Sequence, residues 1–246
     1  MRLAVLGATG RVGSHIADVL RERGHEVVPM SRATGVDVTT GAGLDELLAG
    51  VQVIVDAATS PSPDEQEATA FFTASARNVQ DAAARAGVER IVLISIVNTD
   101  RNTGGYGAAK LKHEQALQAG AVPVHVLRAT QFHEFVEQLM QWSLRGDVMR
   151  VPEMQTQLVS ARTVAEAAAD LATGVTDERM SDIAGPQPER LVEVAKLLGA
   201  DVPIEEQPAD RDDPDAVLWA DGGLLPGPGA KLAGPTFAQW ARLAVA

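Results

Sequence analysis

The chain has 246 residues, a formal net charge of −12 and no cysteine. The missing cysteines exclude disulfides, thiolate nucleophiles and cysteine-ligated metals. The acidic balance, with only four lysines, argues against a nucleic-acid surface, which needs clustered lysine and arginine. A strand pattern begins at the first residues and no apolar run approaches about 18 residues, so we expect a cytoplasmic protein without a membrane span.

The first 20 residues carry the most informative pattern. Residues 3–6 form a short apolar run, typical of a buried parallel strand, and a helical pattern follows up to residue 20. Between them, Gly7 permits a sharp turn, Gly10 leaves room for a pyrophosphate, and Gly13 lets the helix lie close to the strand. Free N–H groups and the helix dipole favour an anion at such a turn. The segment therefore predicts a dinucleotide site formed by Gly7, Thr9, Gly10, Arg11, Val12 and Gly13.

The end of the predicted second strand, residues 25–30, bears on the choice of dinucleotide. An acidic residue at this position accepts from the free ribose hydroxyls of NAD, whereas an arginine binds the 2′-phosphate of NADP. Here Ser31 and Arg32 follow the strand, and Arg11 adds a second cation. We therefore expect NADP(H) to be preferred, with NAD(H) as the alternative. Asp37 and Val38 are expected at the adenine, with Asp37 near its exocyclic amine.

Strand and helix patterns alternate through the first half of the chain. Such alternation is typical of a parallel sheet with helices on both faces. We predict an α/β fold, a doubly wound (Rossmann-like) parallel sheet, with residues 1–130 as its cofactor-binding core. The strands that follow the second are expected at 51–55, 91–96 and 124–127, and the helices at 44–48, 65–86 and 106–118.

Beyond residue 130 the pattern becomes less regular. Helices are expected over 132–144 and 163–172, separated by connections rich in proline and glycine. Because ligands of doubly wound sheets lie beyond the carboxyl ends of the strands, we expect residues 131–246 to form a smaller lobe that covers a substrate pocket and is integrated with the core. Phe132 and Phe135 either pack a helix against the sheet or line that pocket, and Trp219 and Trp240 are expected to close the lobe.

The only tyrosine of the chain, Tyr106, stands four residues before Lys110. Positions i and i+4 share a helix face, so the ammonium can approach both the phenol and a bound ribose. We expect this ammonium and a nicotinamide ring to lower the pKa of the phenol from about 10 towards neutrality. Ser95, at the end of a predicted strand, is the candidate for holding a substrate oxygen.

These segments together resemble the short-chain dehydrogenase/reductase superfamily, and more specifically its atypical, NmrA-like NAD(P)-binding branch. Many members of that branch have lost the catalytic tyrosine, but the Tyr-x-x-x-Lys pair is intact here. The resemblance implies cofactor contacts at Ala57, Ala58, Thr59, Lys110, Thr130 and Phe132, and a backbone hydrogen bond from Asp56. The motifs are GATGRVG (7–13), Arg32, AAT (57–59), SIVNTD (95–100), YGAAKLKHE (106–114) and VLRATQF (126–132).

Three functions are compatible with these residues. The first is a reductase in which NADPH gives hydride to a small carbonyl, quinone or activated alkene, with Tyr106, Lys110 and Ser95 as the catalytic set. The second is a non-catalytic NADP(H)-binding redox sensor, and the third is a sugar-nucleotide epimerase or dehydratase, disfavoured by the few basic residues of the predicted lobe.

The histidines lack metal-ligand spacing, so no metal is expected. An oligomer is not indicated.

Overall fold

The computed structural model describes residues 1–244 and centres on a seven-stranded sheet in which every pairing is parallel. The strand order is β12-β9-β5-β4-β3-β1-β2, so the chain reverses direction across the sheet at β1. This arrangement confirms the predicted doubly wound α/β fold. The strands are β1 (Arg2–Leu6), β2 (Glu26–Met30), β3 (Val53–Asp56), β4 (Arg90–Ile96), β5 (Val124–Ala129), β9 (Met180–Ala184) and β12 (Lys231–Leu232).

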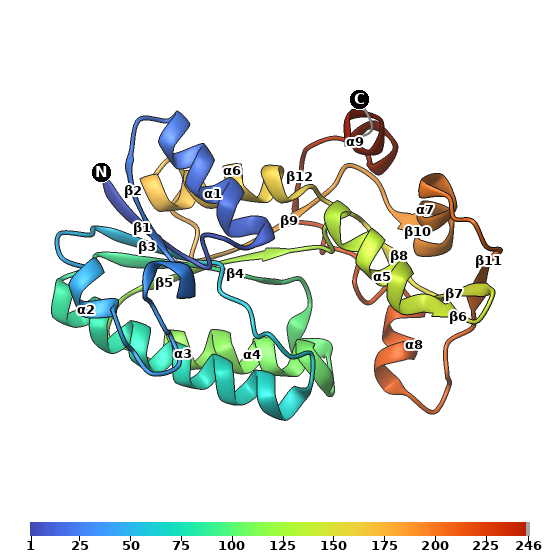
Figure 1. Ribbon diagram of the computed structural model, residues 1–246, viewed down its shortest axis with the longest axis horizontal. Coiled ribbons are helices and arrows are strands. Elements are labelled where there is room, and N and C mark those ends of the chain that lie inside the picture. The colour runs from blue at the N-terminus through green and yellow to red at the C-terminus, as the bar shows by residue number, and fades with distance from the viewer. Residues whose placement is uncertain (245–246) are drawn as a thin grey trace.

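Helices cover both faces of this sheet (Figure 1). Helices α1 (Arg11–Glu22) and α6 (Ala161–Thr173) share one apolar cluster with one face. The opposite face packs against α2 (Leu44–Leu47), α3 (Glu65–Ala86) and α4 (Gly105–Gln118). Three short 3-10 helices lie at Arg32–Thr34, Thr99–Arg101 and His133–Phe135.

Local sequence signals explain why the long helices begin and end where they do. The side chain of Asp64 accepts from the N–H of Glu67, and Gly87 closes α3 in the left-handed conformation, so the predicted bounds 65–86 are confirmed. The side chain of Ser160 caps α6 in the same way, through the N–H of Thr163. The strands β3 and β4 are almost completely buried, as expected for central parallel strands.

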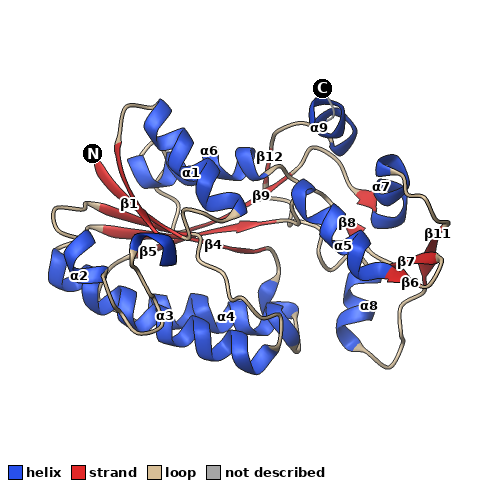
Figure 2. Cartoon of the chain, viewed as in Figure 1, coloured by secondary structure: helices blue, strands red, loops and turns tan. Residues whose placement is uncertain are grey.

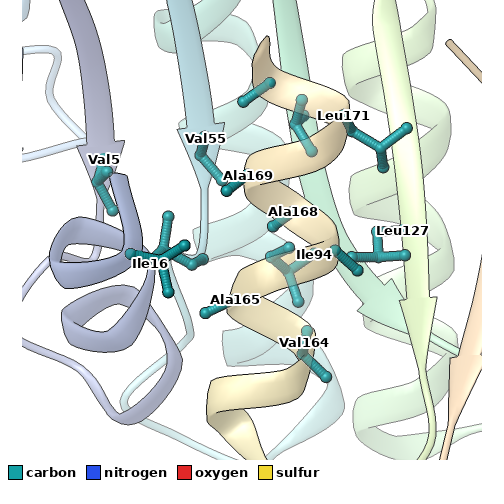
Figure 3. Close-up of a cluster of buried hydrophobic side chains, with 14 of the residues drawn as sticks. Val5, Ile16, Val55, Ile94, Leu127, Val164, Ala165, Ala168, Ala169 and Leu171 are labelled. Carbon is teal, nitrogen blue, oxygen red and sulfur yellow. The ribbon is translucent and has the colours of Figure 1, made fainter. Parts of the chain in front are cut away.

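Small side chains allow α6 to approach the sheet closely. Ala165, Ala168 and Ala169 are fully buried, and they lie among Ile16 of α1 and the branched side chains of the strands (Figure 3). Alanine has no rotamers to lose on burial and keeps the distance between helix and sheet short. Through α6, β9 and β12, the second half of the chain thus completes the main sheet.

The remaining residues form a lobe with its own apolar core (Figure 2). Trp219 and Trp240, which are expected to close this lobe, both pack against its apolar core, and Trp240 also packs against the ring of Phe237. The lobe comprises α5 (Val136–Ser143), β6 (Leu144–Arg145), β7 (Val148–Pro152), β8 (Gln155–Thr156), β10 (Glu189–Arg190), α7 (Leu191–Leu198), β11 (Ile204–Gln207), α8 (Pro214–Ala220) and α9 (Phe237–Ala244).

The predicted helix over 132–144 is wrong at its start. Phe132 is extended, bridges to Val159 and packs against the core of the main sheet, and a 3-10 turn separates it from α5. Within α5, Val136 and Met140 pack into the lobe rather than onto the sheet, and Trp142 is 53% exposed. None of the helices within residues 1–244 is long and apolar enough to cross a membrane.

Candidate functional site

The carboxyl ends of β1 and β3 form the switch point of the sheet. Gly7 directly follows β1 and has a φ of 71°, and its N–H donates to the carbonyl of Met30 at 2.9 Å. A Cβ at this position would lie 2.6 Å from the carbonyl oxygen of Ala57, closer than van der Waals contact permits. Only glycine therefore allows the turn after β1 to pass so close to the turn after β3.

A second close approach places the start of α1 against this turn. A Cβ on Gly13 would lie 2.1 Å from the carbonyl oxygen of Gly7, while Gly10 donates to that same oxygen at 2.8 Å. The first-turn N–H groups of a helix have no partner within the helix, and the first turn of α1 carries no acidic residue. Thr9, Gly10 and Arg11 are exposed beside them. These residues fit the pyrophosphate of a dinucleotide.

The two arginines predicted to select the cofactor both lie at the surface near this turn. Arg11 begins α1, and Arg32 begins the 3-10 turn directly after β2. Within residues 1–244 neither guanidinium has an ion-pair partner, and the buried hydroxyl oxygen of Ser31 has no hydrogen-bond partner. No carboxylate ends β2, since the strand closes with Pro29 and Met30.

Asp37 and Val38 have structural partners in the loop that follows. Oδ1 of Asp37 accepts from the N–H of Thr39 at 2.8 Å and from its hydroxyl at 2.6 Å, and these bonds lower the pKa of the Asp37 carboxyl. Val38 packs against the core, and its carbonyl accepts from Asn78. The carboxylate of Asp37 is thus engaged in holding its own turn.

Tyr106 lies in the first turn of α4, where it reaches the carboxyl edge of the sheet. Its hydroxyl is 2.5 Å from Oγ1 of Thr59, which follows β3, and its ring packs edge-on against Phe72 of α3. Burial raises the pKa of the Tyr106 phenol, and the hydrogen bond with Thr59 offsets this only in part. The part of the prediction that relied on Lys110 is wrong, because its ammonium faces His113 and Phe72 and does not lower the pKa of Tyr106.

The ammonium of Lys110 is buried between α3, α4 and the end of β3. Its Nζ is 3.1 Å from Nδ1 of His113 and 4.7 Å from the ring centre of Phe72. Burial lowers the pKa of Lys110 to about 8, although the charges of Asp56 and Glu114 favour the ammonium. Glu114 is itself paired with Arg128 through two hydrogen bonds of 3.0 and 2.7 Å.

His113 connects this ammonium to the carboxylate of Asp56. Because an ammonium can only donate, Nδ1 of His113 is the acceptor and the neutral ring carries its proton on Nε2, which lies 3.5 Å from Oδ2 of Asp56. Burial and the nearby Lys110 both lower the pKa of His113. The predicted backbone bond of Asp56 is confirmed, as Oδ1 accepts from the N–H of Ala58 at 2.9 Å.

Sequence reasoning missed His113 and Phe72 as neighbours of the tyrosine and lysine. His113 lies three residues beyond Lys110, on the same face of α4. That spacing was a usable signal for His113. Phe72 comes from another helix, and its stacking on His113 at 4.6 Å depends on tertiary packing.

The other predicted site residues end neighbouring strands. Ser95 is buried near the end of β4, in register with Ile91 and Leu93 on the face covered by α3 and α4, and its Oγ has no partner among the described residues. The hydroxyl of Thr130, just beyond β5, donates to the carbonyl of Gln157 at 2.5 Å. Within residues 1–244 no group of three His, Asp or Glu side chains is placed to hold a metal.

The parallel sheet and the glycine turn at its switch point together define a Rossmann-like dinucleotide-binding protein. The profile of the NAD(P)H-binding family matches residues 7–174. Because this match covers more than half of the chain, the protein belongs to that family, and the expectation of an NAD(P)-binding protein is confirmed. No curated protein matches the sequence.

Solved structures with the same fold come from enzymes that differ in reaction. The NADPH complex of an Escherichia coli NADPH-dependent quinone oxidoreductase has 18% identity and a TM-score of 0.75, over 99% of this chain and 100% of that one. The enzyme WbmH of Bordetella bronchiseptica, bound to NAD⁺, has 17% identity and a TM-score of 0.73, over 99% and 97%. A dTDP-4-dehydrorhamnose reductase of Clostridium acetobutylicum has 18% identity and a TM-score of 0.70, over 85% and 84%. These similarities confirm the fold expected from the short-chain dehydrogenase/reductase resemblance.

Replacing Gly13 by alanine is expected to damage the phosphate turn. The new Cβ meets the backbone of Gly7, so the helix and the turn must separate, at a cost of about 1–3 kcal/mol. Thermal unfolding should show a lower midpoint, and calorimetry a weaker affinity for NADPH. Gly229→Ala is the control, since its Cβ enters open space. Equal stability and affinity in Gly13→Ala and the wild type would contradict the close approach.

The single tyrosine makes the pKa of Tyr106 directly measurable. Tyrosinate absorbance in a pH titration of the folded protein should rise with a midpoint above about 10, the ordinary value, because burial disfavours the phenolate. Thr59→Val should move the midpoint higher still, since it removes the hydrogen bond that lowers the pKa. The chain unfolded in urea supplies the reference. A midpoint at or below that of the unfolded chain would show that the burial is wrong.

Proposed function

We propose that the protein is an NADPH-dependent reductase of a small carbonyl, quinone or activated alkene. The observation that carries this proposal is the position of Tyr106. Its hydroxyl lies 2.5 Å from Thr59, at the edge of the sheet where the glycine turn opens, and Lys110 follows one helical turn later. A proton donor thus lies beside the cradle that fits the dinucleotide.

Each side chain has a distinct part in this reaction. Bound NADPH supplies a hydride, and Tyr106 supplies the proton that completes the reduction. The phenol of Tyr106 is protonated at neutral pH, as a proton donor requires, although its raised pKa makes it a weaker acid than a free phenol. We assign Lys110 to the cofactor ribose, which its ammonium reaches only by turning away from His113, and the unpartnered hydroxyl of Ser95 to the substrate oxygen.

Several residues support NADP(H) over NAD(H) as the cofactor. Arg11 and Arg32 flank the phosphate turn as exposed guanidinium groups, and β2 ends without a carboxylate that would repel a 2′-phosphate. Guanidinium pairs with phosphate through charge-assisted hydrogen bonds. The remaining contacts that we assign to the cofactor are Thr9, Val12, Ser31, Asp37, Val38, Ala57, Ala58, Thr59, Thr130 and Phe132.

The lobe supports a small, partly apolar substrate. Phe135, which ends the 3-10 turn after β5, and Trp142 of α5 pack their rings edge-to-face at 5.7 Å. Trp142 and Leu144 are both strongly exposed. An apolar surface of this kind suits a quinone or hydrophobic carbonyl better than a charged sugar nucleotide, so we assign the cover of the substrate to the part of residues 131–246 that lies outside the main sheet.

Arg32→Ala is expected to weaken NADPH binding by about tenfold or more, since a hydrogen bond to a charged group contributes about 1.5–3 kcal/mol. NADH binding should stay within about twofold, because NADH lacks the 2′-phosphate. Titration calorimetry with both cofactors makes the comparison. Arg21→Ala, which removes an equal charge from the far end of α1, serves as the control. Tighter binding of NADH than of NADPH by the wild type would overturn the cofactor preference.

Turnover is tested with NADPH and a panel of quinones, aldehydes, ketones and enones. Tyr106→Phe should lower kcat by about 10²–10⁴-fold, the usual contribution of a general acid, and leave NADPH affinity unchanged. The inward hydrogen bond of Lys110 to His113 favours the sensor alternative, in which Tyr106 takes part in no reaction. Tight NADPH binding with no turnover across the panel would reject the reductase and leave the redox sensor.

A further inference from the structure

The loop between β4 and α4 holds Tyr106 in place through contacts that come from elsewhere in the chain. This loop, residues 97–104, ends at Gly104, the residue that caps α4 and has no side chain with which to do so. Two carboxylates take over this task. One is Glu65 of α3, which accepts from the N–H of Gly105 at 2.9 Å.

The second carboxylate is Asp215, from helix α8 of the lobe. Its Oδ1 accepts from the N–H of Thr103 at 2.9 Å and from the hydroxyl of Thr103 at 3.1 Å, and its Oδ2 accepts from the N–H of Gly104 at 3.3 Å. A negative charge is favourable at the N-terminus of a helix, and α4 has no acidic residue in its own first turn. One side chain of the lobe thus binds both residues that precede the tyrosine-bearing turn.

Asn98 attaches the start of the same loop to the turn that follows α8. Its Nδ2 donates to the carbonyls of Gly223 and Leu225 at 2.9 and 2.7 Å. Asn98 is the one non-glycine residue with positive φ among the described residues, at 53°, a conformation that asparagine tolerates better than most. The loop is therefore attached to α8 through Asp215 and to the turn after α8 through Asn98, and Figure 1 shows α8 beside the end of α4 at which the chain enters.

Helix capping also explains two of the carboxylates in the acidic run at residues 210–215. Asp213 caps α8 by accepting from the N–H groups of Asp215 and Ala216, which fixes the helix turn that presents Asp215. Asp212, in contrast, makes no side-chain hydrogen bond or ion pair within residues 1–244. Two carboxylates of this run, those of Asp213 and Asp215, thus cap helices.

From these contacts we infer that Asp215 is a positioning residue for Tyr106. Through α8, the position of the phenol thus depends on the position of the lobe. Asp215 acts through Thr103 and Gly104, and it needs no contact with the substrate. A shift of the lobe by an ångström is transmitted to the first turn of α4. This inference rests on the proposed reductase function for its effect on turnover, but its structural part stands without it.

The test compares Asp215→Ala with Asp215→Asn and with Asp212→Ala, which removes the same charge from the same run without touching the loop. Asp215→Ala should increase hydrogen–deuterium exchange in peptides covering residues 98–106 at least fivefold. The absorbance titration of Tyr106 should move towards about 10, since a loosened turn exposes the phenol to water. In turnover, kcat should fall about tenfold with the KM for NADPH unchanged. Asp215→Asn, which keeps an acceptor for Thr103, should lie in between.

The outcomes separate the two proposals. If the wild type shows no turnover, the reductase fails, and exchange and the tyrosine titration still decide on the positioning role. If Asp215→Ala matches Asp212→Ala in exchange, titration midpoint and kcat, the positioning role is overturned whether or not the protein is a reductase. Circular dichroism and the unfolding midpoint confirm that each variant is folded, and a global increase in exchange in Asp215→Ala would also count against a local role.

Discussion

The fold and the site both depend on the contact of three backbone segments at the carboxyl end of β1. The carbonyl of Gly7 lies against the start of α1, and the α-carbon of Gly7 lies against the turn after β3. Neither contact tolerates a side chain, so the spacing of the glycines sets how near the helix N-terminus comes to the switch point. The exposed first turn of α1 and the AAT turn are consequently close enough to bind one ligand between them.

The same edge of the sheet also collects the buried charges. Asp56 ends β3, and around it lie His113 and Lys110 of α4, with Glu114 paired to Arg128 behind them. Removing one partner of such a group leaves an uncompensated charge in the interior, which is strongly unfavourable. The pKa of Lys110 therefore depends on its burial and on the charges of Asp56 and Glu114. Its ammonium contacts Phe72 of α3 and His113 of α4, so it contributes to the packing of these two helices.

The parts of the fold and of the site that depend on contacts between neighbours in the chain could be predicted from the sequence. The glycine turn, the buried strands and the bounds of α3 follow from apolar runs, capping residues and glycines that are neighbours in the chain. The start of the helix predicted over 132–144 is wrong because the spacing of its aromatic residues imitates a helical face, while Phe132 in fact forms an isolated bridge with the distant Val159. The direction of Lys110 and the hydrogen bonds of Asp215 could not be predicted, since each depends on side chains brought together by tertiary structure.

The alanine-rich helix α6 has a consequence for how the protein is made. It covers the face of the sheet on which α1 packs, and β9 pairs with the free edge of β5, yet both elements come after residue 160. A nascent chain that has emerged only to residue 130 holds all the phosphate-turn residues but exposes apolar strand surface and an unpaired edge, the features that make partly synthesised chains prone to aggregate. The order of elements along the chain thus leaves this surface and this edge uncovered until α6 and β9, the latter ending at residue 184, have been synthesised.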